Sequence, residues 1–240
     1  MANFILVHGA MHGGWCWERI VPLLEGEGHS VVAPDLPGLG QDRTPAAQVT
    51  LPGWGRFVAD LLERGPGRTI LVGHSLGGIA ISQAAEYAPD RIGALAYLSA
   101  VLPRDGTSAV ETTRGGDEAR PRMLPSPDGE YITLDPAETR TFLYGETSDE
   151  WFAHALSRMT PQPLNVLQTP LRLSGEHFGS VPRAYIECLR DRVLPLHLQR
   201  SMQASSPCRP VFQIDTDHSP FYSAPEALAA HLLTIAAQFG

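Results

Sequence analysis

The 240-residue chain contains no lysine, so all 18 of its basic side chains are arginines. The 26 Asp and Glu residues give a formal net charge of −8, and no run of basic residues occurs anywhere in the sequence. Nucleic acids and anionic membrane surfaces are bound through clusters of positive charge, so neither is an expected partner. Long apolar runs are also missing. No stretch approaches the about 20 residues that a membrane span requires, and the N-terminus lacks the features of a secretory signal.

Cysteine is scarce as well. Cys16, Cys188 and Cys208 are odd in number and widely separated in the sequence. This pattern excludes a disulfide framework and a zinc site of regular spacing, and it favours a reducing compartment. We therefore expect a cytoplasmic protein that needs no metal. The sequence leaves open whether the chain forms a homodimer.

Short β-rich segments alternate with helical patterns along most of the chain. The predicted strands span residues 4–8, 30–34, 69–74, 94–99, 183–189 and 210–214. The predicted helices span residues 16–27, 53–64, 76–88, 195–205 and 225–239. Several strands are apolar throughout, as parallel strands are when helices cover both faces of the sheet. The alternation predicts an α/β fold with a mainly parallel sheet.

This alternation stops between residues 103 and 179, where Pro, Gly and charged residues are more frequent. We interpret this segment as a lid or cap inserted between two core segments, residues 1–102 and 180–240. A long surface excursion without functional consequence is the alternative, although long inserted loops are commonly lids. Within the segment, "SPDGEY" predicts a hairpin turn, and Asp135 is predicted to cap a short helix.

Further helix signals are more specific. The stretch "SDEWFAHALSRM" predicts an amphipathic helix with its apolar residues on one side, namely Trp151, Ala155, Leu156 and Met159. Two Ser/Thr residues stand three positions before a glutamate, which is the spacing of a capping box. These pairs are Thr147 with Glu150 and Ser223 with Glu226.

The stretch "TILVGHSLGGIA" places Ser75 between Gly73 and Gly77, where a β-rich run changes to a helical one. A sharp strand-to-helix turn brings neighbouring segments so close that side chains at the two glycine positions would collide. Such a turn projects the serine hydroxyl and leaves the first N–H groups of the helix free. Ser75 is therefore a candidate nucleophile. The alternative is a serine that only caps the helix.

A serine nucleophile needs a base. Of the nine histidines, His218 follows a predicted strand on a loop before the last helix. Ligand sites in parallel sheets lie at the carboxyl ends of strands, so His218 is the candidate base. We interpret the other histidines as structural or solvated.

The base in turn needs a carboxylate to orient it, and in this kind of site the acid stands between the serine and the histidine in chain order. Asp191 follows the predicted strand 183–189 and is the favoured acid, with Glu187 and Asp215 as weaker candidates. The alternative for Asp191 is an ion pair with a neighbouring arginine.

An oxyanion requires a second donor besides the Leu76 N–H. The Gly-rich stretch "HGAMHGG" after the first predicted strand can approach the nucleophile because Gly9 has no side chain. The N–H of Ala10 is the candidate donor. An ordinary strand–helix turn is the alternative.

Together, "FILVHGAMHGGWCW", "SVVAPDLPGLG", "LVGHSLGG", "LSAVLP", "RDRVLPLHLQ" and "DTDHSPFYSAPEAL" resemble the α/β-hydrolase fold. They are most similar to the plant methylesterase and hydroxynitrile lyase branch and its bacterial esterase relatives. The resemblance covers both core segments and is weak across residues 103–179. It implies a triad of Ser75, His218 and Asp191, with main-chain donors at Ala10 and Leu76.

The lyases of this branch use a lysine beside the catalytic histidine and a threonine or asparagine in the first-strand turn. The corresponding positions here are Ser219 and Gly9, and the chain has no lysine at all. The groups that would handle cyanide are therefore missing, which disfavours hydroxynitrile lyase activity.

These observations predict a serine hydrolase that cleaves a small carboxylic ester, a thioester or a lactone through an acyl-enzyme, without a cofactor. The expected partner is thus a small ester-like molecule. Residues expected to line its pocket are Gly9, Phe142, Tyr144, Trp151 and Phe152, although these aromatics could equally form the lid's own core. Two other classes stay open on the same fold: a ligand-binding protein and a non-hydrolytic biosynthetic enzyme.

Overall fold

A computed structural model describes residues 1–115 and 120–240 of the chain. Its main sheet has six strands in the order β2-β1-β3-β4-β8-β9, and every neighbouring pair is parallel. The strands are β1 (Asn3–Val7), β2 (Ser30–Val32), β3 (Thr69–His74), β4 (Ile92–Leu98), β8 (Arg183–Cys188) and β9 (Val211–Ile214). All six coincide with predicted strands to within two residues at either end, which confirms the α/β prediction.

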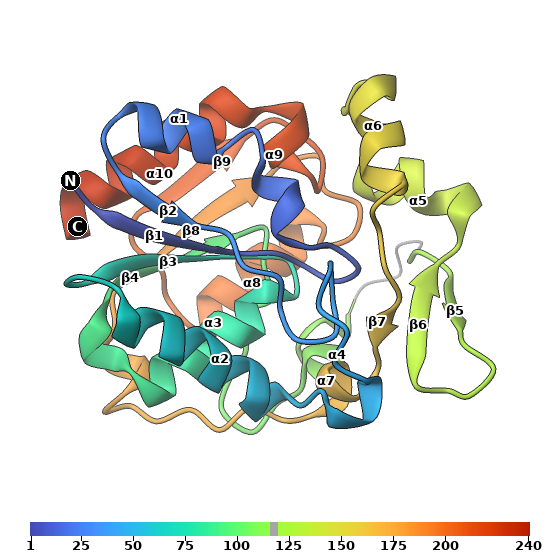
Figure 1. Cartoon of the computed structure of the whole chain (residues 1–240), viewed down its shortest axis with the longest axis horizontal. Coiled ribbons are helices and arrows are strands. Elements are labelled where there is room, and N and C mark those ends of the chain that lie inside the picture. The colour runs from blue at the N-terminus through green and yellow to red at the C-terminus, as the bar shows by residue number, and fades with distance from the viewer. Residues whose placement is uncertain (116–119) are drawn as a thin grey trace.

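Helices cover both faces of this sheet (Figure 1). On one side lie α1 (Val21–Gly26) and α10 (Pro225–Phe239), and on the other lie α2 (Leu51–Arg64), α3 (Gly77–Tyr87) and α8 (Leu196–Ser205). The residues of β3 are buried throughout, with Ile70 and Val72 packed in one apolar cluster and Leu71 in the other. Successive strand residues point to opposite faces, so an apolar strand serves both helical layers.

The predicted helix 16–27 is wrong as one element. The structure has two, the 3₁₀ helix η1 (Gly14–Trp17) and α1, because the chain turns between them before Pro22 enters the first turn of α1. Other short helical turns connect the core elements. They are η2 (Ala46–Gln48), η3 (Pro89–Arg91), η4 (Phe178–Ser180) and α9 (Pro220–Ser223). No helix among the described residues is long and apolar enough to cross a membrane.

The segment 103–179, which we call the insertion, connects the adjacent parallel strands β4 and β8. The predicted hairpin is confirmed, since β5 (Met123–Pro125) pairs antiparallel with β6 (Tyr131–Leu134). A third short strand that the sequence did not reveal, β7 (Gln162–Pro163), completes a small sheet. The helices of the insertion are α4 (Ala109–Thr112), α5 (Pro136–Leu143), α6 (Asp149–Leu156) and α7 (Asn165–Gln168).

Helix caps were predicted with mixed success. Asp135 does cap α5, because its side chain accepts the Ala137 N–H at 3.0 Å. The Thr147 capping box is wrong, since Ser148 caps α6 instead. The Ser223 capping box is also wrong, because α10 begins after Ala224 without a side-chain cap. Leu156 does not share the buried side of α6 and is 42% exposed.

Candidate active site

Ser75 lies in the turn between β3 and α3 with a φ of 51°, a left-handed conformation that few non-glycine residues adopt. The turn is very tight. A Cβ atom at Gly77 would lie 2.6 Å from the His8 carbonyl oxygen, and one at Gly73 would lie 2.9 Å from the Gly77 carbonyl carbon. Only glycine fits at either position, and the close packing presents Ser75 at the carboxyl edge of the sheet.

His218 reaches this serine from the loop between β9 and α9. The Ser75 hydroxyl donates to His218 Nε2 across 2.9 Å, and the imidazole is 1% exposed. The backbone of the loop is held too, because His74 Nε2–H donates to the His218 carbonyl oxygen at 2.8 Å. The candidate base is thus held both by a hydrogen bond to its ring and by a hydrogen bond to its backbone.

Asp191 follows β8 and completes the arrangement. Its Oδ2 accepts the Nδ1–H of His218 at 2.5 Å, while its Oδ1 accepts the backbone N–H groups of Val193 at 2.7 Å and Leu194 at 2.8 Å. Since a carboxylate only accepts, His218 carries its proton on Nδ1 and presents Nε2 to the serine as an acceptor.

Ser99, at the end of β4, also contacts this carboxylate. Its hydroxyl donates to Asp191 Oδ2, so four donors surround the acid. Sequence reasoning missed Ser99 as a site residue. Its position directly after a buried parallel strand, at the sheet edge where the other groups were expected, is the signal that could have indicated it.

The two weaker acid candidates lie elsewhere. Glu187 is buried on β8, where Arg200, Gln203 and Gln213 hydrogen-bond it. Asp215 forms a bidentate pair with Arg190 at the surface. Neither carboxylate contacts His218 among the described residues, and Asp191 does not pair with Arg190.

Three further histidines are buried around the turn. Burial lowers the pKa of His8 to about 4 and that of His12 to about 3, and it holds the pKa of His74 well below the usual 6.5. Desolvation disfavours the charged imidazolium, so these rings are neutral near pH 7. Each has a structural contact: His8 Nδ1–H, for example, donates to the Gly9 carbonyl oxygen at 2.9 Å.

The two candidate oxyanion donors border a cavity that also contains Ser75. Ala10 and Leu76 both line it, and among residues 1–115 and 120–240 their N–H groups have no acceptor. Close approach of the two loops depends on Gly9, where a Cβ atom would lie 2.8 Å from the Ser75 Cβ. The arrangement offers two free N–H groups beside the serine, as an oxyanion site requires.

This cavity measures about 280 Å³ and is lined mainly by apolar side chains. They include Met11, Val101, Ala109, Leu167, Val193 and Leu194. None of the five residues expected to line the pocket is among the described residues that do so. Gly9 packs against the Ser75 side chain, and Tyr144 is fully buried against His12.

The remaining aromatic residues of that prediction belong to the packing of the insertion. Phe152 contacts the Tyr144 ring, and Trp151 stacks on Tyr222 with ring centroids 5.0 Å apart. Phe142 contributes to α5. The aromatic cluster therefore joins the insertion to the core. The cavity beside Ser75 is instead bordered mainly by aliphatic residues, with Thr113 and Arg120 as polar members of its lining.

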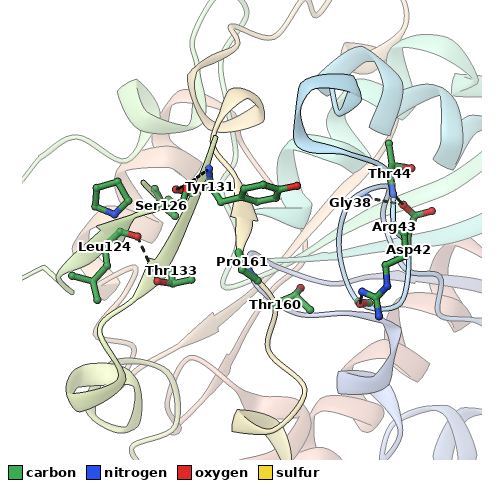
Figure 2. Close-up of a pocket in the computed structure, with 13 residues that line it drawn as sticks. Gly38, Asp42, Arg43, Thr44, Leu124, Ser126, Tyr131, Thr133, Thr160 and Pro161 are labelled. Carbon is green, nitrogen blue, oxygen red and sulfur yellow. Dashed lines mark hydrogen bonds between the residues drawn. The ribbon is translucent and has the colours of Figure 1, made fainter. Parts of the chain in front are cut away.

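A second cavity, of about 370 Å³, lies between the loop 38–44 and the β5–β6 hairpin (Figure 2). Leu124 and Thr133, which pair across the hairpin, line this second cavity, whereas Met123 lines the cavity beside Ser75 and Ile132 borders both. Because successive strand residues point to opposite faces, the hairpin forms a wall between the two cavities.

Comparison with known proteins identifies the family. A model described as "Alpha/beta hydrolase family" matches residues 4–231. The chain belongs to the alpha/beta hydrolase family.

Relatives of this α/β-hydrolase lie in the branch that the sequence resembles. The chain is 36% identical to a pyrethroid hydrolase of Sphingobium wenxiniae, and the match covers 95% of this chain and 85% of the relative. It is 33% identical to methylesterase 7 of Arabidopsis thaliana, over 99% of this chain and 97% of that one. The structure of a variant of tomato methylketone synthase I in complex with β-ketoheptanoate superposes with a TM-score of 0.87 and is 28% identical in sequence. The match covers 100% of this chain and 99% of that chain.

These similarities confirm the predicted family and its esterase character. Relatives named methylesterase and pyrethroid hydrolase cover nearly the whole chain. This α/β-hydrolase is therefore an esterase-type enzyme.

Proposed function

We propose that this enzyme hydrolyses small carboxylic esters through an acyl-enzyme formed on Ser75. One observation carries the proposal: His218 lies between the Ser75 hydroxyl, at 2.9 Å, and the Asp191 carboxylate, at 2.5 Å. A nucleophile, a base in hydrogen-bond contact with it and an acid that fixes the base are the three parts that acyl transfer by serine needs.

In the proposed reaction the Ser75 oxygen attacks the ester carbonyl carbon while His218 Nε2 takes the hydroxyl proton. The Ala10 and Leu76 N–H groups stabilise the resulting oxyanion, and Asp191 stabilises the imidazolium. The imidazolium then gives its proton to the leaving alcohol. Water, deprotonated by the same histidine, releases the acid and restores Ser75.

The cavity supports an apolar substrate of modest size. Its mainly aliphatic lining and its volume of about 280 Å³ suit an ester with a short acyl group or a compact alcohol. Thioesters and lactones present the same electrophilic carbonyl and belong to the same proposal.

Hydrolysis of p-nitrophenyl acetate tests this function. The wild-type enzyme should release p-nitrophenol, and Ser75→Ala should lower kcat by about 10⁴-fold or more. A fluorophosphonate should label wild type on the peptide containing Ser75 and leave Ser75→Ala unlabelled. Full activity in Ser75→Ala, or labelling at another serine, would contradict the proposal.

A non-hydrolytic reaction is the second candidate, favoured by the likeness to methylketone synthase I. The corresponding activity would convert β-ketoheptanoate and a proton to 2-hexanone and carbon dioxide. Incubation with β-ketoheptanoate and detection of the ketone by gas chromatography separates the two candidates. We expect ester hydrolysis to depend on Ser75 and ketone formation to stay at the uncatalysed rate.

A further inference from the structure

The insertion holds the loop that carries the Ala10 N–H through three hydrogen bonds. Thr160 N–H donates to the Met11 carbonyl oxygen at 3.0 Å, and Met11 N–H donates to Gln162 Oε1 at 3.3 Å. The Tyr144 hydroxyl contacts His12 Nε2 at 2.6 Å. Met11 itself has a φ of 64°, a conformation that needs such support in a residue with a side chain.

The contact between Tyr144 and His12 continues to Ala10. The Ala10 carbonyl oxygen can only accept, so His12 Nδ1 carries a proton and donates it there at 2.7 Å. Because burial lowers the pKa of His12 to about 3, the ring is neutral and its Nε2 is free to accept the Tyr144 hydroxyl proton. The direction of both hydrogen bonds is therefore fixed.

Both rings are enclosed. Tyr144 is 0% and His12 1% exposed, and the His12 ring stacks on Trp15 with centroids 5.2 Å apart. The Gly9–Ala10 peptide, which carries the Ala10 N–H, is held as well, because His8 Nδ1–H donates to the Gly9 carbonyl oxygen. Ala10 is thus fixed through the carbonyl groups before and after its N–H.

We propose that Tyr144 is a positioning residue for acyl transfer, acting through His12 to keep the Ala10 N–H aimed at the oxyanion. The inference rests on the proposed ester hydrolysis at Ser75. It assigns a second role to the insertion, which completes the oxyanion site in addition to bordering the cavity. A hydrogen bond to an oxyanion forms fully only in the transition state, so its misplacement lowers kcat more than it changes KM.

Tyr144→Phe tests the proposal because it removes one hydroxyl and leaves the ring. We expect kcat for p-nitrophenyl acetate to fall about tenfold with KM within about twofold of wild type. Affinity for a trifluoromethyl ketone, which forms a tetrahedral adduct with the nucleophile, should fall by the same factor as kcat/KM.

Tyr131→Phe is the matched control. Tyr131 also belongs to the insertion, and its hydroxyl accepts a hydrogen bond from a core loop, the Ala46 N–H at 3.1 Å, beside the second cavity (Figure 2). Tyr131→Phe should lose about as much thermal stability as Tyr144→Phe and keep the wild-type kcat. Equal loss of kcat in both variants would reduce the effect to general loosening and overturn the proposal, as would unchanged kcat in Tyr144→Phe.

Substitutions of His12 give a second test that does not depend on Tyr144→Phe folding. In His12→Asn an amide N–H can replace Nδ1–H toward Ala10, whereas His12→Leu offers no donor. The expected order of kcat is wild type, then His12→Asn, then His12→Leu, and equal kcat in the two variants would contradict the inference. Wild type and Ser75→Ala are assayed alongside, so loss of the proposed function itself would be seen separately.

Discussion

At the scale of single residues, the Asp191 carboxylate depends on a neighbour, Ser99, that is not itself part of the proposed triad. Ser99 donates to the same Asp191 oxygen that accepts the His218 Nδ1–H, from a backbone with a φ of 35°. A hydroxyl donor stabilises the carboxylate charge and limits how the side chain can rotate. Ser99 thereby helps to hold the imidazole in the tautomer that the proposed acyl transfer requires.

Ser99→Ala should therefore lower kcat/KM for p-nitrophenyl acetate by about tenfold, because Asp191 loses one of its four donors but keeps its contact with His218. The matched control is Ser82→Ala. Ser82 is also buried and hydrogen-bonded, to Tyr97 and the Gly78 carbonyl on α3, without contacting the site. Both variants should lose about 1 kcal/mol of unfolding free energy, and only the first should lose activity.

At the scale of elements, the buried strands were predictable because apolar runs of this length have few alternatives in an α/β chain. The proximity of Ser75, Asp191 and His218 was predictable for a related reason, since each of them follows a strand at the same edge of the sheet. The prediction of the cavity lining was wrong. The cavity lining depends on how the insertion folds back on the core, which no periodicity encodes.

The two wrong capping boxes have a common physical cause. The Thr147 hydroxyl donates to Asp217 Oδ2 at 3.2 Å, and the Ser223 hydroxyl donates to Asp217 Oδ1 at 2.8 Å. Both hydroxyls thus donate to one buried carboxylate, on the residue before His218, and they do not cap the helices that follow them. A tertiary hydrogen bond to a charged group outweighs a local cap and is invisible in sequence spacing.

Asp217→Asn tests the weight of this connection between the insertion and the His218 loop. Asp217 also accepts the N–H groups of Glu146 and Ser219, so an amide would turn one acceptor oxygen into a donor facing donors. We expect about 2–4 kcal/mol of lost unfolding free energy. In Asp215→Asn, where the carboxylate is 61% exposed and paired with Arg190, the loss should be much smaller because water screens the ion pair. Equal losses in urea unfolding would refute this ranking.

At the scale of the whole molecule, three neutral histidines are enclosed at the carboxyl edge of the sheet. Burial lowers the pKa of His8, His12 and His74, whereas in the unfolded chain each would titrate near the ordinary value of 6.5. Below that value the unfolded state binds protons that the folded state refuses. Unfolding is then favoured increasingly as the pH falls.

We therefore expect the free energy of unfolding to be largest above pH 6.5 and to fall as the pH is lowered to 5, by up to about 1.4 kcal/mol per pH unit for each buried histidine. Urea titrations followed by circular dichroism at pH 7, 6 and 5 measure this slope. Carboxylates whose pKa is lowered in the folded state, such as Glu86 with a usual value of 4.5, also stabilise the fold. Their contribution to the free energy of unfolding is lost only at lower pH, when they become protonated.

The change in net charge over this pH range acts on stability in the opposite direction to the buried histidines. The chain carries a formal net charge of −8, and protonation towards pH 5 reduces this charge and the self-repulsion of the folded state. A fall in stability over this range must therefore come from groups that are buried uncharged. His12→Asn removes one of the three and should make the slope shallower by about a third. A slope that is unchanged in this variant would show that His12 does not contribute to it.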